Sequence, residues 1–189
     1  VVDSAREREK VRGAVSRAHL LAQEPFRRSG DRPRCRERAD DFADRVAETD
    51  SIMVTRLRAA GAIFIGKTNI PEFGLGSHTY NPLYGITRNA FDQTKSAGGS
   101  SGGAGVGVAL RMLPVADGSD HGGSLRNPAA FCGVVGFKPT AGLLPFGGGF
   151  YFSPTLDQVG TFARSVADVA QFTAPLVEGE PFPARIDTR

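Results

Sequence analysis

Two groups of serines flanked by glycines are the residues of this chain best suited to chemistry. Ser100 and Ser101 lie in the run GGSSGG (98–103), and Ser124 ends the run HGGS (121–124). Flanking glycines let the backbone adopt unusual dihedral angles and leave room for a substrate beside the amides. A serine nucleophile and a pocket of N–H donors for an oxyanion need both features. The pattern therefore predicts an acyl-transfer site.

Helical and short apolar strand patterns alternate around these serines, which predicts an α/β protein with a covered, mostly buried sheet. The expected helices cover 3–23, 50–60, 102–112, 124–131 and 165–172, with a short one near Glu72. The expected strands cover 62–65, 113–116 and 134–137, and residues 117–124 form the loop after the second strand. On this pattern alone, Ser124 could instead be the N-cap of the helix that follows it.

Composition excludes several classes of protein. The 189 residues suffice for one domain, and a net charge of +3 is too small to indicate nucleic acid or a membrane surface as partner. No apolar run approaches the roughly 20 residues that span a bilayer, and the charged start is unlike a secretory signal. Two cysteines form neither a disulfide framework nor a metal site. We expect a cytoplasmic protein without a cofactor.

Four ordered blocks carry a resemblance to a known family. They are TDSIMVTRLRAAGAIFIGKTNIPEFGLGS (49–77), GGSSGG (98–103), GSDHGGSLRNPAAFCGVVGFKPT (118–140) and SPTLDQVGTFARSVADVA (153–170). From about Ala47 to about Thr173 the chain resembles the amidase signature family, hydrolases that cleave carbon–nitrogen bonds of amides. The resemblance implies an α/β fold with a mixed central β-sheet covered by helices on both faces. The sheet is expected to be incomplete, because the family's catalytic domain is more than twice this length.

The resemblance implies one partial domain over 1–189. Its expected parts are an N-terminal helix (1–23), an atypical Arg-rich segment (24–45), a family-like core (46–173) and a tail (174–189). The Arg-rich segment lacks apolar periodicity, as an exposed or disordered stretch does. We interpret its residues 24–41 as the product of a shifted reading frame or of scrambling. An incomplete sheet exposes an edge and an apolar face, which favours self-association.

The family's mechanism can be carried onto matching residues. The resemblance implies that Ser124 attacks a small-molecule amide and forms an acyl-enzyme, while Ser100, which follows a cis peptide bond, relays the proton. Backbone N–H groups around His121, Gly122, Gly123 and Ser124 would form the oxyanion pocket.

Neighbouring residues would support this loop. Ser101 is expected to make a substrate or network hydrogen bond. Asp120 and Arg126 stand where the family has an ion pair that shapes the loop; the alternative is two independent surface charges. His121 departs from the family, which more often has threonine or another non-basic residue there. It either adds a titrating group or points away from the pocket, and we expect the latter.

The catalytic base of the family has no counterpart. The resemblance places a lysine in a Lys-Asp motif about 75 residues before the relay serine, where this chain has PFRR (25–28). None of the four lysines matches this position: Lys10, Lys67, Lys95 and Lys138. Arginine cannot act as the base because it stays protonated. The sequence therefore predicts an impaired amidase; the alternative is a catalytically inactive remnant or a partner-binding fragment of one.

Two other interpretations are weaker. GAIFIGKT (61–68) matches the P-loop pattern, but a helix precedes it, its middle residues form a strand, and Pro71 interrupts any helix that follows. The Arg-rich segment lacks the interleaved aromatics or fold motif of an RNA-binding tract. We expect neither nucleotide nor nucleic acid to bind.

Overall fold

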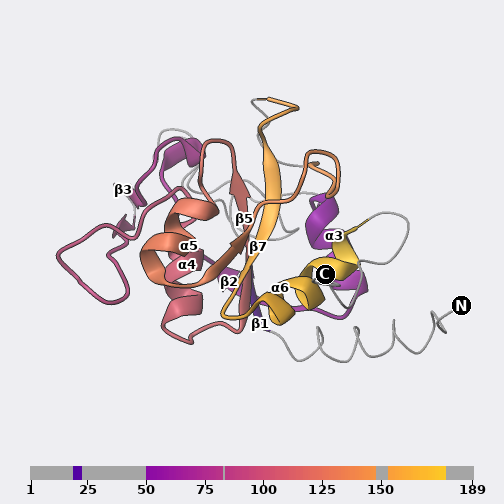
Figure 1. Cartoon of the computed structure of the whole chain (residues 1–189), viewed down its shortest axis with the longest axis horizontal. Coiled ribbons are helices and arrows are strands. Elements are labelled where there is room, and N and C mark those ends of the chain that lie inside the picture. Colours follow the sequence, from indigo (N-terminus) through magenta and orange to yellow (C-terminus); the bar gives the residue numbers. More distant parts are fainter. Residues whose placement is uncertain (1–18, 23–49, 83, 148–152, 178–189) are drawn as a thin grey trace, which may run out of the picture.

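The computed structural model describes residues 19–22, 50–82, 84–147 and 153–177 (Figure 1). The expected helix over 3–18, the Arg-rich segment at 24–45 and the last part of the tail, 178–189, lie outside the described residues. Among the described residues, no helix is both long and apolar enough to cross a bilayer.

The strands form a mixed arrangement. In chain order they are β1 (His19–Ala22), β2 (Ile63–Lys67), β3 (Tyr80–Asn81), β4 (Gly85–Ile86), β5 (Val115–Asp120), β6 (Val135–Phe137) and β7 (Gln158–Ala163). Strands β1 and β2 pair in parallel, and β7 pairs antiparallel with β5 on one side and β6 on the other. Strand β1 also lies beside β5. Strands β3 and β4 make a separate two-residue ladder.

Helices cover both faces of the β5–β7–β6 sheet, as the sequence predicted (Figure 1). They are α3 (Ile52–Ala59), α4 (Gly102–Ala109), α5 (Arg126–Cys132) and α6 (Val166–Thr173), with 3-10 turns η1 (Glu72–Gly74) and η2 (Ala174–Leu176). Because side chains alternate along a strand, Val115 and Val159 face one cluster while Ala116 and Phe162 face the other. The fold is thus α/β with a layer of helices on each side.

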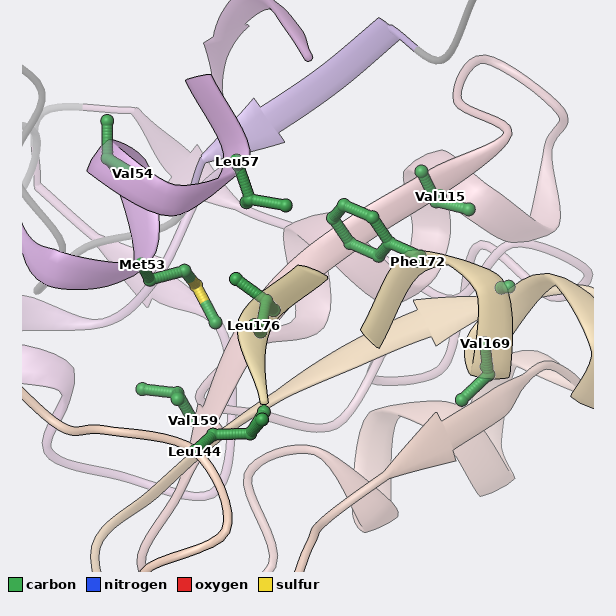
Figure 2. Packing of buried hydrophobic residues seen from close by; sticks show 10 residues of the cluster. Met53, Val54, Leu57, Val115, Leu144, Val159, Val169, Phe172 and Leu176 are labelled. Atoms are coloured by element: carbon green, nitrogen blue, oxygen red, sulfur yellow. The ribbon is translucent and has the colours of Figure 1, made fainter. Parts of the chain in front are cut away.

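The first cluster joins α3, α6 and η2 to the sheet (Figure 2). Figure 2 shows Met53 and Leu57 of α3 directed toward Leu176 and toward Phe172 of α6, above the strands. The second cluster packs α4 and α5 against the opposite face around Phe162, which is fully buried. The serine segments lie on this second side, at the start of α4 and just before α5.

Local signals explain several helix ends. Ser51 caps α3 by accepting a hydrogen bond from the Val54 N–H at 3.2 Å, near the start of the helix expected over 50–60. Ser165, where the helix expected over 165–172 starts, caps α6 by accepting from the Asp168 N–H at 3.1 Å. Helix α5 ends at Gly133, whose φ of 62° is the left-handed conformation typical of a C-terminal glycine.

The N-terminal elements need correction. The helix expected over 3–23 is wrong at its end, because His19–Ala22 form β1 and pair with β2. The strand expected at 62–65 covers Ile63–Lys67, and it is not buried on both faces. Phe64 packs on the first cluster, whereas Ile63 and Ile65 are about half exposed.

Two corrections concern the centre of the sheet. Strand β5 starts at Val115 and runs through Asp120, so 117–120 belongs to a strand and not to a loop. Polar residues continue this strand because β7 pairs with every one of its positions. Strand β7 itself was not predicted, although it lies between β5 and β6.

Candidate active site

The two serine segments contact each other directly. The Ser101 N–H donates to the Ser124 carbonyl at 3.3 Å. The Ser101 hydroxyl also donates to the Ser119 carbonyl at 3.2 Å and accepts from the Ser119 N–H at 3.4 Å. Ser101 therefore ties the start of α4 to the end of β5, which agrees with the network hydrogen bond expected of it. Ser100 is 3% exposed and Ser124 is half-buried.

A tight backbone turn presents Ser100. The Gly99–Ser100 peptide bond is cis, as the family resemblance implies. A Cβ atom on Gly99 would lie 2.8 Å from the carbonyl carbon of His78, so the close approach of these two backbones requires glycine. The segment thus fits against the chain that precedes β3.

Thr79 organises this turn, although no sequence pattern singles it out. Its buried hydroxyl lies 2.9 Å from the Gly98 carbonyl and 3.1 Å from the Ser100 carbonyl, and it accepts from the Gly102 N–H at 2.9 Å. One hydroxyl therefore satisfies backbone groups on both sides of the cis bond. Contacts across about 20 residues leave no periodic signal in a sequence.

Asp120 holds the loop that carries Ser124. Its carboxylate accepts from the N–H groups of Gly123 at 2.9 Å, Leu125 at 3.1 Å and Arg126 at 3.3 Å. Gly123 has a φ of 128°, which a residue with a Cβ atom rarely adopts. The carboxylate and the glycine together set the path of the backbone into α5.

Arg126 pairs with the same carboxylate. Its Nε donates to Oδ2 of Asp120 at 3.0 Å and its Nη2 donates to Oδ1 at 2.8 Å, which makes a bidentate ion pair. The alternative of two independent surface charges is therefore wrong. Burial alone would raise the pKa of Asp120, but hydrogen bonds from Arg126 and from the three N–H groups together lower the pKa below 3.8.

Several polar groups of the site have no hydrogen-bond partner in the described part of the chain. They are the N–H groups of Gly122 and Ser124 and the hydroxyls of Ser100 and Ser124. Ser124 is not the N-cap of α5: that position is Leu125, and no side chain caps the helix from it. The capping alternative for Ser124 is therefore wrong, because its hydroxyl does not cap α5.

The His121 side chain contacts an acidic residue of another segment. Its Nδ1 lies 2.6 Å from Oδ1 of Asp157, although the imidazole is half exposed. Asp157 immediately precedes β7, and the sequence did not single it out. The pair joins the loop after β5 to the neighbouring strand.

No lysine within the described ranges bonds to either hydroxyl. Lys67 is buried at the end of β2, Lys95 pairs with Asp92 at 3.1 Å, and Lys138 donates to the Pro139 carbonyl at 3.2 Å. The expected position of the catalytic lysine, residues 25–28, lies outside the described residues. Those residues contain no lysine in any case.

Other ligand sites find little support. The P-loop pattern at 61–68 lies on β2, and the chain continues into a loop and η1 instead of a helix. Among the residues that the structure places, no three His, Cys, Asp or Glu side chains gather as a metal site would require.

Comparison with known proteins gives a consistent set of matches. A family model described as Amidase matches residues 39–182. A glutamyl-tRNA(Gln) amidotransferase subunit from Alkaliphilus metalliredigens is 50% identical over 129 residues, which are 68% of this chain and 26% of that protein. The chain thus spans about a quarter of the length of this curated relative.

Solved structures agree. The crystal structure of the corresponding glutamyl-tRNA(Gln) amidotransferase subunit from Thermotoga maritima superimposes with a TM-score of 0.77 at 34% identity, over 90% of this chain and 38% of that one. A bacterial aryl acylamidase gives 0.76 at 27% identity, over 97% of this chain and 41% of that one. The expected α/β fold is thereby confirmed.

Proposed function

Because this chain belongs to the amidase signature family, we propose that it carries the nucleophile of an amide-hydrolysing site, with Ser124 as acyl acceptor and Ser100 as proton relay. The observation that best supports this is the hydrogen bond from the Ser101 N–H to the Ser124 carbonyl, which joins the two serine segments. A relay requires such proximity.

The substrate class is a small molecule with an amide bond. In the first step the Ser124 oxygen forms a bond to the carbonyl carbon and its proton passes through Ser100 toward the leaving nitrogen. The carbon–nitrogen bond breaks and the amine departs. Water then cleaves the ester, which releases the acid and restores the hydroxyl.

The oxyanion formed in each step needs preorganised donors. The N–H groups of Gly122 and Ser124 are suited to this, whereas the Gly123 N–H already donates to Asp120. The role of Gly123 is then to permit the turn that presents its neighbours. Removal of one such donor typically costs about 2.7–4 kcal/mol of transition-state stabilisation. Asp120 and Arg126 hold the backbone that follows Gly122 in this loop.

A second function has an observation in its favour. The chain spans about a quarter of its curated relative and has no Lys-Asp pair anywhere in its sequence. The missing Lys-Asp pair favours a catalytically inactive remnant or a partner-binding fragment. The curated relative is named as one part of a larger enzyme, so the partner of such a fragment would be another protein chain.

A fluorophosphonate probe separates the two functions. Attack by Ser124 forms a P–O bond, breaks the P–F bond and releases fluoride together with the hydroxyl proton. We expect labelling of the folded chain at Ser124, its loss in Ser124→Ala, and slower labelling in Ser100→Ala. Ser77→Ala is the matched control, because this serine is exposed and makes no hydrogen bond within the described ranges. A folded chain that takes up no label at Ser124 would instead indicate the remnant.

A further inference from the structure

A buried carboxylate and a half-exposed imidazole meet where β5 ends and β7 begins. Asp120 pairs with Gln158 in the antiparallel ladder, so His121 and Asp157 are the next residues across the two strands. The Asp157 side chain is 4% exposed and that of His121 is 51% exposed. Their 2.6 Å contact is one of the short polar contacts of the site.

Two hydrogen bonds with Ser153 hold Asp157 independently of His121. Its second oxygen, Oδ2, accepts from the Ser153 N–H at 2.7 Å, and its own N–H donates to the Ser153 carbonyl at 2.9 Å. The carboxylate is therefore locked into the turn that precedes β7. Because a carboxylate only accepts hydrogen bonds, we assign the proton of this contact to Nδ1 of His121. The bond fixes both the tautomer and the orientation of the ring.

The loop 121–124 is held differently at its two ends. The bonds from Asp120 reach the N–H groups of 123, 125 and 126, but none reaches Gly122. A Cβ atom built on Gly122 would meet nothing within 4 Å, so packing does not restrain this residue either. Glycine has more conformational freedom to lose than any other residue. What restrains Gly122 from its N-terminal side is His121.

We propose that His121 is a positioning residue whose Nδ1–H···Oδ1 bond to Asp157 fixes the start of the oxyanion loop, so that the Gly122 N–H faces the reacting carbonyl oxygen. This rests on the proposed acyl transfer at Ser124. A donor stabilises an oxyanion fully only if it is already in place before the reaction. Asp157 acts through His121 and is also a positioning residue.

Two substitutions of His121 separate the effect of its hydrogen bond to Asp157 from the effect of the imidazole ring itself. His121→Ala removes the donor. His121→Asn places an amide N–H near the position of Nδ1 and cannot exchange a proton as imidazole does. For fluorophosphonate labelling at Ser124, we expect the rate constant to fall on the order of tenfold in His121→Ala, less than the loss of a whole oxyanion donor. In His121→Asn we expect it to stay within about threefold of the wild type.

Two outcomes would overturn the proposal. Labelling of His121→Ala at the wild-type rate would show that the contact positions nothing. Labelling of His121→Asn as slow as that of His121→Ala would show that the imidazole itself is required, for example in proton transfer. If the wild-type chain takes up no label, the acyl-transfer function fails by itself.

A second measurement tests the positioning role of His121 even if the wild-type chain takes up no label. Amide hydrogen exchange of the peptide that contains 121–124 needs no reactive serine. We expect faster exchange in His121→Ala and wild-type exchange in His121→Asn, at equal thermal stability of all three proteins. Equal exchange in the wild type and in His121→Ala would contradict the proposal.

Discussion

Asp120 makes more hydrogen bonds than any other side chain of the candidate site, and its side chain is fully buried. Asp120→Ala leaves three N–H groups near α5 without their acceptor and separates Arg126 from its partner. A hydrogen bond to a charged group contributes roughly 1.5–3 kcal/mol, and Arg126 is exposed enough for water to compensate part of the loss. We expect the free energy of unfolding, measured with urea, to fall by about 2–3 kcal/mol. Lys95→Ala, which removes an exposed ion pair, should leave it nearly unchanged.

The same carboxylate makes the loop sensitive to acid. Folding lowers the pKa of Asp120 below 3.8, so in acid the unfolded chain binds the proton more readily than the folded one. The stability that this group contributes is therefore complete above the unfolded pKa, near pH 4, and is lost as the pH falls through the lower folded value. Urea midpoints measured from pH 7 to pH 2 should converge for the wild type and Asp120→Asn at the acid end. A constant difference over the whole range would show that the charge is not responsible.

The sequence pointed to some of these residues and not to others. Ser100, Ser124, Asp120 and Arg126 lie in short glycine-rich blocks, so their neighbours along the chain suffice to propose them. Asp157 meets His121 over 36 positions, and only the register of β5 with β7 brings them together. No local pattern contains that register. A polar residue whose partner is distant looks like any loop residue.

At the scale of elements, the turn before α4 depends on a side chain from outside it. Thr79→Val keeps the shape of the side chain but removes the hydroxyl shared by Gly98, Ser100 and Gly102. Buried backbone groups left without a partner cost roughly 1–3 kcal/mol. We expect Thr79→Val to lower the free energy of unfolding by that amount and to slow labelling of Ser124. Thr79→Ser, which keeps the oxygen, should label at close to the wild-type rate. Equal labelling of both variants would contradict this role.

Helices were easier to predict than strands for a physical reason. The sequence features that predict a helix, such as caps, glycine ends or apolar spacing, lie within or next to the helix itself. This holds for α3, α4, α5 and α6. Strand β5 continues through Asp117 and Asp120, which are buried, and such residues are depleted in strands. It is a strand because β7 pairs with it, which is a property of the sheet. For the same reason β1 was mistaken for the end of a helix.

At the scale of the whole molecule, β2 is an edge strand among the residues that the structure describes. Ile63 and Ile65 are about half exposed, and β1 is the partner of β2 in the described sheet. Apolar edge strands tend to pair with other chains. We expect concentration-dependent self-association in sedimentation velocity, reduced by Ile65→Lys and unchanged by Met112→Lys, which alters an exposed residue outside this strand. Equal association of the two variants would exclude β2 as the contact.

The sharpest expectation for the whole molecule is that it holds a nucleophile without its base. No Lys-Asp pair occurs in the sequence, and the lysines that the structure places make no bond to Ser100 or Ser124. Loss of one member of a catalytic unit costs orders of magnitude in rate. On a simple aryl amide we expect kcat/KM on the order of 10⁴-fold or more below that of an aryl acylamidase of this family. Labelling by a fluorophosphonate should persist, because its P–F bond is already activated. Turnover within a hundredfold of the acylamidase, abolished by Ser124→Ala, would mean that another group in this chain accepts the proton.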